Sequence, residues 1–391
     1  MPAVNRIKGL VKDLFFLGLL PLIYRVSSWL GVKNRALLIT QRTLSGPDDF
    51  AAVESLLEQA GIPCERYCLM AEKGQKTYLL RTLRLAALAA GNRFLLTNDS
   101  INALLCLPLR KESLLVQLWH ACGAFKKWGY ACLENRFGED AKTLKKYYQH
   151  QKYTLVSVSS EFVVPYYEAA FGLEPGSGIV QALGVARTDR YFDPLLQKSA
   201  KEKVKAALGL KAEQKILLYA PTFRGELESA KAPEMPDLSK MKEKLREDWV
   251  VILRQHPGVK NPPLLLEKWA GFAFSGQELS MEELLFACDA AVTDYSSWIF
   301  EYALLGKPLF FFAPDLGAYD TERGFFLPYE EMIPAPFFET TDRLIEALQQ
   351  GTFDAEKLAA FRETYMSACD GNAAGRIADF LLSAAKEKEK N

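Results

Sequence analysis

The stretch MEELLFACDAAVTDYSSWIFEYALLGKPLFFFAPD, residues 281–315, decides how the rest of the chain is interpreted. Apolar side chains repeat at helical spacing from Leu284 to Cys288, whereas residues 290–292 and 309–312 form continuous apolar runs typical of buried strands. A second helix fits between these two runs. The pattern therefore predicts a βαβ unit, the building block of a parallel sheet covered by helices.

The turn after the first of these strands reads Thr293-Asp294-Tyr295-Ser296-Ser297. Small hydroxyl and acidic side chains cap helices well, and the first N–H groups of a helix attract anions. Ligands of open parallel sheets bind at the carboxyl ends of the strands, so Thr293, Asp294, Ser296 and Ser297 are candidate phosphate-binding residues. On spacing alone, an ordinary capped turn without a ligand is the simpler interpretation.

Short apolar runs alternate with amphipathic helical segments on both sides of this unit, which is typical of doubly wound α/β domains. The expected strands are 36–40, 66–70, 94–97, 114–118, 154–158, 215–219 and 249–253. A chain of 391 residues is long enough for two such domains. We expect an N-terminal α/β domain over residues 36–193 and a second α/β domain over 194–352, with a separate segment, 1–35, before them and helices over 353–391 after them.

The composition excludes several classes of protein. Lys plus Arg equals Asp plus Glu at 48 each, so no net charge marks the chain as a nucleic-acid-binding protein. The seven cysteines have neither the spacing of a metal site nor the density of a disulfide scaffold, and no DxD or HExxH sequence occurs. We therefore expect no nucleic-acid partner, no cofactor and no metal site.

The first 35 residues contain a short apolar run with basic flanks. Arg6, Lys8 and Lys12 precede the uncharged run 14–24, which is too short to span a bilayer, and no small-residue cleavage site follows it. A helix lying in the membrane interface fits this pattern, with apolar side chains in the lipid and basic ones at anionic headgroups. A helix that packs against its own domain fits it equally, so both interpretations stay open.

The chain has three histidines, and two of them stand just after expected buried strands. His120 follows strand 114–118 and His256 follows strand 249–253, so both belong at the crevice edge of their sheets, where an imidazole is suited to acid–base chemistry. A histidine at a strand end is also common as a structural residue. His150 lies in a polar helical run, and we expect it at the surface.

Several motifs, in order along the chain, resemble those of the CDP-glycerol glycerophosphotransferase family. The segments that carry the resemblance are TDYSSWIFEYALLGKPLFFFAPDL at 293–316 with ERGFF at 322–326, APTFR at 220–224, RQHP at 254–257, and WH at 119–120 with KK at 126–127. The segment 119–127, which contains WH and KK, is similar to a family pattern Trp-His-Gly-Thr-Pro-Leu-Lys-Lys. Residues 121–125 depart from this pattern and lengthen the loop by one residue. The resemblance covers most of residues 114–380.

The resemblance implies the GT-B fold, in which two doubly wound Rossmann-like domains face an intervening cleft and C-terminal helices pack across both. It implies transfer of glycerol phosphate from CDP-glycerol to a hydroxyl of a lipid-linked or polymeric cell-envelope acceptor, releasing CMP. Such enzymes make teichoic acids and related polymers of the cell wall or capsule. A protein of this kind would work as a peripheral protein on the cytoplasmic face of the cell membrane, with the lipid-linked glycerol phosphate acceptor and the membrane surface as partners.

The resemblance also implies roles for individual residues. His120 would be the general base. His256, Arg224 and the helix N-terminus at Ser296 and Ser297 would stabilise the charge that builds on the diphosphate. The remaining candidates are Lys126 and Lys127 for acceptor phosphates, Glu301 for the ribose hydroxyls, and Arg323, which either assists at a phosphate or orders its own loop. Without the resemblance, each of these side chains also fits an ordinary surface or structural position.

Other activities stay open within this fold. The sequence does not separate CDP-glycerol from CDP-ribitol as the donor, nor an enzyme that adds one unit from one that adds many. A sugar-nucleotide glycosyltransferase, or a binding protein that has lost catalysis, would share the two-domain pattern.

Overall fold

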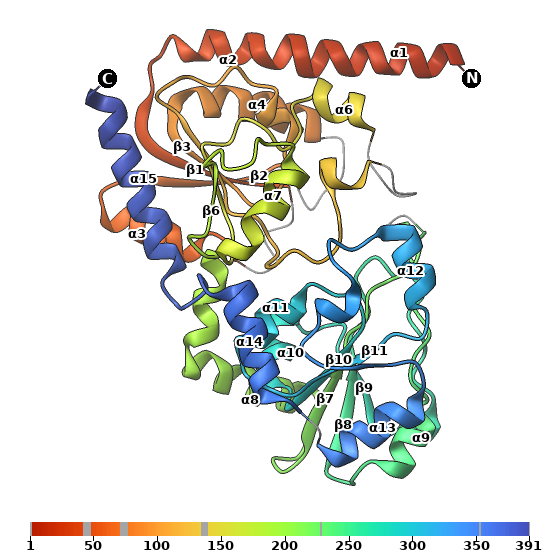
Figure 1. The fold of residues 1–391 in the computed structure, drawn as a ribbon. Helices are drawn as coiled ribbons and strands as arrows, with labels where there is room; N and C mark the ends of the chain where they lie inside the picture. The colour runs from red at the N-terminus through yellow and green to blue at the C-terminus, as the bar shows by residue number, and fades with distance from the viewer. Residues whose placement is uncertain are drawn as a thin grey trace.

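The computed structural model describes residues 2–41, 48–70, 77–133, 140–226, 229–351 and 353–390. These residues form two α/β domains, one above the other in Figure 1, each built on a six-stranded sheet. The first sheet contains β1 (Lys33–Thr40), β2 (Cys64–Cys68), β3 (Asn92–Thr97), β4 (Leu114–Gln117), β5 (Leu155–Ser157) and β6 (Val180–Gln181). The second contains β7 (Lys215–Tyr219), β8 (Trp249–Leu253), β9 (Ala273–Ser275), β10 (Ala290–Thr293), β11 (Leu309–Phe312) and β12 (Phe337–Phe338).

Both sheets are doubly wound. Their strand orders are β2-β1-β3-β4-β5-β6 and β12-β11-β10-β7-β8-β9, and every pairing within them is parallel. The strand order reverses at β1 and β3 in the first sheet and at β7 and β10 in the second, which is where ligand crevices of such sheets open. The predicted α/β class with two Rossmann-like domains is confirmed.

Helices cover both faces of each sheet. Those of the first domain are α3 (Ala51–Gln59), α4 (Tyr78–Gly91), α5 (Asn102–Leu105), η3 (Gly129–Cys132), α6 (Ala141–Lys146), η4 (Glu161–Val163) and α7 (Val164–Phe171). Those that follow are η5 (Ala186–Phe192), α8 (Pro194–Leu208), α9 (Leu238–Lys244), η7 (Glu267–Trp269), α10 (Met281–Ala287), α11 (Trp298–Ala303), α12 (Leu316–Arg323), η8 (Tyr329–Glu331), α13 (Thr341–Gln350), α14 (Ala355–Met366) and α15 (Ala373–Lys390).

The predicted βαβ unit forms the centre of the second domain as α10, β10, α11 and β11. All four residues of β10 and of β11 are buried, because helices cover both faces of the sheet. Ser280 begins α10 through a reciprocal capping box with Glu283. The apolar runs of the sequence therefore predict this unit correctly, since their length and flanking caps match their buried positions.

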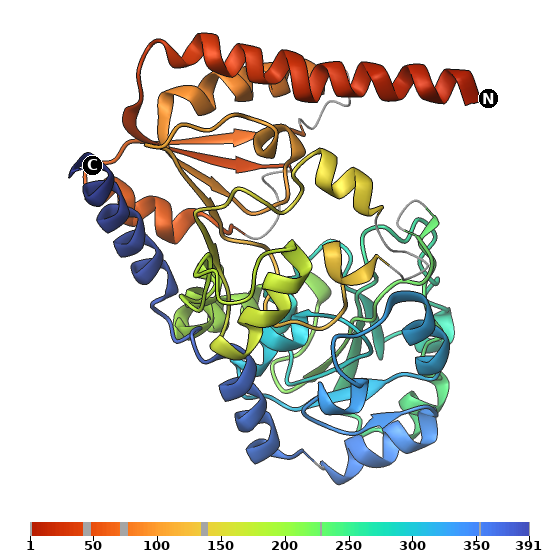
Figure 2. The same ribbon diagram turned by 45° about the horizontal axis from the view of Figure 1, so that its top comes forward.

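The C-terminal helices contact both domains. Helix α14 packs against α11 of the second domain, and α15 packs against α3 of the first. Figure 2 shows the two helices following one another along one side of the molecule. Asp189, from η5, caps the start of α15. Its carboxylate accepts hydrogen bonds from the backbone N–H groups of Ala373 and Ala374, both at 2.9 Å.

The N-terminal segment is one long helix that lies across the first domain (Figure 1). It comprises α1 (Pro2–Asp13), the π-helical stretch η1 (Leu14–Leu19) and α2 (Leu20–Ser28), and we call it the helical arm. Leu20 and Tyr24 are buried against the domain, and the Tyr24 hydroxyl accepts a hydrogen bond from the N–H of Arg110. The opposite side leaves large apolar side chains exposed. Within the described residues, no helix has the length and apolar character needed to cross a bilayer.

Candidate active site

The carboxyl ends of the two sheets meet at a pocket of about 460 Å³ between the domains. Its lining from the first domain includes Trp119, His120, Lys126, Lys127, Trp128, Gln149 and His150, and its lining from the second domain includes Thr222, Phe223, Ser297, Tyr319 and Arg323. Five of the candidate residues from the sequence therefore come together here. We call this space the interdomain pocket.

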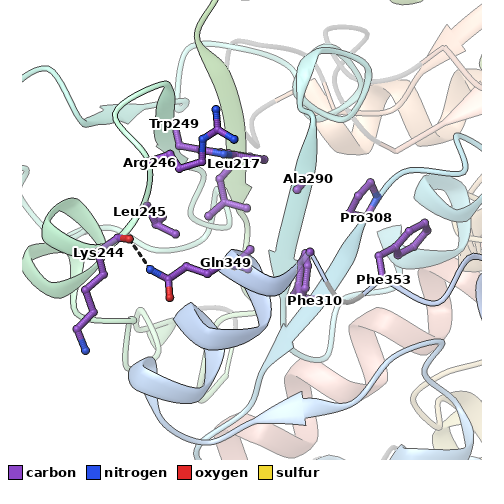
Figure 3. Close-up of a pocket in the computed structure, with 12 residues that line it drawn as sticks. Leu217, Lys244, Leu245, Arg246, Trp249, Ala290, Pro308, Phe310, Gln349 and Phe353 are labelled. Atoms are coloured by element: carbon purple, nitrogen blue, oxygen red, sulfur yellow. Dashed lines mark hydrogen bonds between the residues drawn. The ribbon is translucent and has the colours of Figure 1, made fainter.

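A second hollow, of about 250 Å³, lies at the opposite edge of the second sheet, where β8, β10 and β11 begin (Figure 3). Its walls are mostly apolar, and it contains none of the candidate residues. Lys244 and Arg246 are at its edge, but the strands begin here, and α/β enzymes hold their ligands where the strands end. We therefore place the chemistry in the interdomain pocket.

His120 is held in one tautomer by the end of the neighbouring strand. Its Nδ1 lies 2.7 Å from the carbonyl oxygen of Asn98 and 3.3 Å from Oδ1 of Asp99, two residues that follow β3. Both partners accept hydrogen bonds, so Nδ1 carries a proton, and in the neutral form of the ring Nε2 has the lone pair. The indole of Trp119 stacks on the imidazole at 4.6 Å between ring centroids. This is the form and the orientation that a general base requires.

Asp99 was not among the candidates from the sequence. A usable signal was present, because the polar run 97–100 follows a buried strand that pairs with the strand carrying His120 at its end. The carboxyl ends of adjacent parallel strands lie at one sheet edge, so their first loop residues are neighbours.

His256 has the opposite tautomer. Its Nδ1 accepts a hydrogen bond of 3.0 Å from the N–H of Gly258, so the proton of the neutral ring is on Nε2. Burial lowers the pKa of His256, and the charges of Lys126 and Arg254 lower it further, so the ring is neutral near pH 7. The ring lies against Phe223, at 4.7 Å between centroids, just behind the lining of the interdomain pocket. It can therefore donate a hydrogen bond without carrying a charge.

Lys126 and Lys127 lie where the loop after β4 meets the second domain. Residues 125–127 and 324–326 form a short antiparallel bridge, with hydrogen bonds of 3.1 Å from Lys127 N to the Gly324 carbonyl and from Phe326 N to the Phe125 carbonyl. The Lys126 ammonium lies 3.3 Å from the Tyr319 hydroxyl, and Lys127 is exposed at the pocket rim. Both ammonium groups are thus available to an anionic ligand in the pocket.

Two residues of the βα turn have structural contacts instead of the phosphate contact expected from the sequence. Thr293 is buried and donates to the Ala220 carbonyl at 2.8 Å. Asp294 is 1% exposed and accepts hydrogen bonds from Thr222 N at 2.7 Å and Tyr295 N at 2.6 Å. They join the turn after β10 to the turn after β7. Ser296 and Ser297 are half-buried at the start of α11, and Ser297 lines the interdomain pocket.

Arg224 lies just past β7, as expected, and its guanidinium is held by other protein groups. Its guanidinium binds Asp315 through Nε at 2.6 Å and Nη2 at 2.9 Å, reaches Asp294 at 2.9 Å, and donates from Nη1 to the Thr222 carbonyl at 2.7 Å. Four hydrogen bonds to protein oxygens use most of the five N–H groups that an arginine has. The residue thereby fixes the turns around the pocket, and the phosphate contact expected of Arg224 stays a prediction.

Glu301 is buried away from the pocket lining. Its carboxylate pairs with Arg187, whose guanidinium also reaches Asp49 at 3.4 Å. Arg187 lies in η5, at the end of the first domain, and also contacts Asp49 of that domain, whereas Glu301 belongs to α11 of the second domain. The pair therefore ties the domains together. This differs from the ribose contact expected from the sequence, because a carboxylate buried against an arginine from another element is not presented to a ligand.

Arg323 contacts the loop after β7 and also faces the interdomain pocket, so its expected role at a phosphate stays a prediction. Its guanidinium donates to the Gly225 carbonyl and lies 5.6 Å from the Phe223 ring centroid, which orders the loop after β7. The same residue lines the interdomain pocket.

The expectation that His150 lies at the surface is wrong. Helix α6 ends at Lys146, and the chain then turns through Tyr148, His150 and Lys152, all with positive φ. The His150 side chain turns inward, is 3% exposed, and stacks on Phe171 at 4.8 Å. Burial lowers the pKa of His150 to about 4, so the ring is neutral. A polar helical pattern in the sequence does not reveal such a turn.

Comparisons with known proteins agree with this geometry. The family model described as CDP-Glycerol:Poly(glycerophosphate) glycerophosphotransferase matches residues 58–383. The chain is 34% identical over 345 residues to the teichoic acid ribitol-phosphate primase of Bacillus spizizenii, covering 86% of this chain and 87% of that protein. It is 28% identical over 348 residues to the teichoic acid glycerol-phosphate primase of Bacillus subtilis, covering 88% and 84%.

A solved structure of the wall teichoic acid polymerase TagF has the same fold, with a TM-score of 0.74 at 19% identity, covering 100% of this chain and 98% of that one. At this identity the likeness concerns the fold, and the family follows from the sequence match over 58–383. The chain belongs to the CDP-glycerol:poly(glycerophosphate) glycerophosphotransferase family.

Proposed function

We propose that this chain transfers an alditol phosphate from its CDP-activated form to a hydroxyl of a lipid-linked or polymeric cell-envelope acceptor, releasing CMP. The observation that carries the proposal is a pair of histidines with opposite tautomers, His120 in the lining of the interdomain pocket and His256 just behind it. One ring presents a lone pair to accept a proton, and the other presents an N–H to a developing negative charge.

The step balances as a single displacement at phosphorus. The acceptor oxygen attacks the phosphorus that bears the alditol, and its proton passes to Nε2 of His120. The bond from that phosphorus to the oxygen shared with the CMP phosphate breaks, and the pair of electrons leaves with CMP. The Nε2–H of His256 and the ammonium of Lys126 stabilise the charge on the leaving phosphate. Ser297 and Arg323 orient the diphosphate from the second domain.

Two donors have support. The matching family is named for CDP-glycerol, the donor expected from the motifs, whereas the relative from Bacillus spizizenii is a ribitol-phosphate primase. The two primases compared above are similar in length to this chain, whereas a poly(ribitol-phosphate) polymerase that also aligns is covered only to 59% of its length. We infer that the chain adds few units rather than a long polymer.

The deciding experiment measures CMP release by the purified chain with CDP-glycerol or CDP-ribitol and a lipid-linked glycerol phosphate acceptor. Acceptor-dependent CMP release from one donor, lost in His120→Ala with binding of that donor retained, supports the proposal and identifies the donor. Release of a nucleoside diphosphate from sugar nucleotides, with no reaction of either CDP-alditol, contradicts it and favours a glycosyltransferase. Donor binding without turnover under any condition favours a binding protein.

We also propose that the protein acts as a peripheral protein on the cytoplasmic face of the membrane, held by the helical arm. The support is an exposed apolar stripe, including Leu10 and Leu14 at 62% and 72% exposure, beside Lys8 and Lys12. Such a stripe can lie in the headgroup region while basic side chains meet anionic lipids.

A further inference from the structure

A groove of about 820 Å³ separates the helical arm from the loops of the first domain beneath it. Residues of the arm, among them Leu14, Leu17 and Gly18, form one wall, and Lys146, Tyr148 and Lys152 belong to the other. In Figure 1 the arm passes over α6, which ends where this second wall begins. We call this space the arm groove.

The wall formed by the arm is apolar and open. Leu14 and Leu22 are 72% and 57% exposed, and they continue the exposed stripe that begins at Ile7 and Leu10. Gly18 leaves a gap in the middle, since a Cβ built there would meet only a Leu14 methyl carbon at 3.4 Å. The wall coincides with the π-helical stretch 14–19, and π-helical turns occur frequently at functional sites.

The opposite wall is cationic. The Lys152 ammonium lies 3.8 Å from the Tyr148 ring centroid and 3.3 Å from the Leu107 carbonyl, and no carboxylate among the described residues pairs with it. Burial disfavours the charged form of Lys152 and so lowers its pKa. An anion nearby would stabilise the charged ammonium group. Arg25, which belongs to the arm itself, adds a second cation to the groove from the other side. Lys146, by contrast, is paired with Asp13 at 2.5 Å.

The cationic wall is also a wall of the interdomain pocket. Lys146, Tyr148 and Lys152 face the arm groove, while Gln149 and His150 line the pocket of His120. Three of the residues from 148 to 152 have positive φ, which costs energy for residues other than glycine and is concentrated at functional sites. One strained turn therefore separates an apolar, cation-bearing groove from the proposed base.

We propose that the arm groove binds a lipid phosphate, with the hydrocarbon chain along the arm and the phosphate at Lys152 and Arg25. The inference rests on the proposed function, because the arm groove would be the binding site of the lipid-linked acceptor, from which the polar end of that acceptor can reach His120. The exposed stripe of the arm leads into the groove, so a lipid can enter it from a membrane surface without passing through water.

The test titrates the full chain by calorimetry with dodecyl phosphate, below the concentration at which it forms micelles. Dodecyl maltoside and inorganic phosphate serve as the chain-only and headgroup-only probes. We expect dodecyl phosphate to bind at least tenfold more tightly than either probe. Gly18→Leu places a side chain in the gap, with its Cβ at an ordinary contact distance from Leu14, and should weaken binding of dodecyl phosphate at least tenfold. Lys152→Gln should abolish the preference for phosphate over maltoside.

Gly9→Leu is the matched control, because Gly9 lies on the same arm with open space around it and does not line the groove. It should bind dodecyl phosphate like the parent chain. Three results would each overturn the proposal. The first is an equal effect of Gly9→Leu and Gly18→Leu on binding, and the second is equal affinity for inorganic phosphate and dodecyl phosphate. The third is a preference for phosphate over maltoside that remains in Lys152→Gln. No nucleotide is needed, so the two proposals fail separately. CMP release without this binding overturns the lipid site alone, and binding without CMP release overturns the proposed function alone.

Discussion

The Nδ1 atom of His120 lies 3.3 Å from an oxygen of Asp99, at the ends of two adjacent strands. The carboxylate orients the ring and favours the imidazolium that forms when Nε2 takes a proton. Asp99→Asn should therefore lower kcat for CMP release about 10- to 100-fold and leave KM for the CDP-alditol nearly unchanged. Steady-state kinetics across pH 5 to 9 would measure both.

Asp379→Asn, at an exposed position of α15, is the matched control and should be as active as the parent chain. A kcat of Asp99→Asn equal to that of the parent would show that the Asn98 carbonyl alone orients His120.

His256 is predicted to act as a neutral donor. Because its pKa lies below the ordinary value for histidine, protonation of His256 should not limit the rate above pH 6.5. His256→Phe should lower kcat roughly 100-fold through loss of the Nε2–H, while the pH at which kcat/KM is half-maximal on the acidic side stays the same. A shift of that acidic limb in His256→Phe would assign it to His256 rather than to another group.

Glu301 is predicted to support the fold, not the nucleotide. Glu301→Gln leaves the buried Arg187 with only its 3.4 Å contact to Asp49. Removing one partner of a buried ion pair costs about 3–5 kcal/mol, so the urea midpoint of unfolding should fall markedly. The KM for the CDP-alditol should not change. A raised KM for the CDP-alditol with an unchanged urea midpoint would contradict this prediction and support the ribose contact expected from the sequence.

His150 predicts a pH-dependent stability. Its pKa is about 4 in the folded chain, against 6.5 for an unperturbed histidine, so between these values the unfolded chain binds a proton that the folded chain does not. The stabilisation is complete above pH 6.5 and is lost as the pH falls toward 4, by up to about 3 kcal/mol. His150→Phe keeps a ring against Phe171 and should show a smaller loss of unfolding free energy from pH 7 to 5. Equal pH slopes in both proteins would contradict this.

The helical arm predicts binding to anionic vesicles. Leu20 and Tyr24 are buried, so removing residues 1–31 would remove part of the core, and point changes are cleaner. The double variant Leu10→Glu, Leu14→Glu should lose most co-sedimentation with phosphatidylglycerol vesicles, because both exposed side chains would enter the apolar layer. Leu195→Glu, on α8 and 76% exposed, is the matched control. Retained binding by the double variant would mean that the arm is only a structural helix.

The sequence predicts the fold well because its main signal is local. The strands β10 and β11 are buried on both faces, so they appear as continuous apolar runs, and the helices beside them keep a regular spacing of apolar residues. The strands β6, β9 and β12 lie at the edges of their sheets, have only two or three residues each, and were not predicted. The equally short β5 lies inside its sheet and belongs to the longer, mostly apolar stretch 154–158, which made it recognisable.

The site is predicted less completely, because its contacts join distant parts of the chain. Arg224 is paired with Asp315, 91 residues away, and Glu301 with Arg187, 114 residues away. The residues next to Arg224 and Glu301 in the sequence do not indicate these partners. A motif therefore identifies the side chain but not the residue with which it pairs. The left-handed turn that buries His150 is equally invisible, since no glycine marks it.

The short antiparallel bridge between residues 125–127 and 324–326 has a consequence for motion. Its two backbone hydrogen bonds tie the loop that carries His120 to the loop that follows Arg323. If one domain rotates relative to the other and these bonds are kept, the rotation must take place about the bridge, which lies beside the interdomain pocket. In such a motion His120 and Arg323 would keep their places on either side of the bridge, and we expect the interdomain pocket to open on the side away from it.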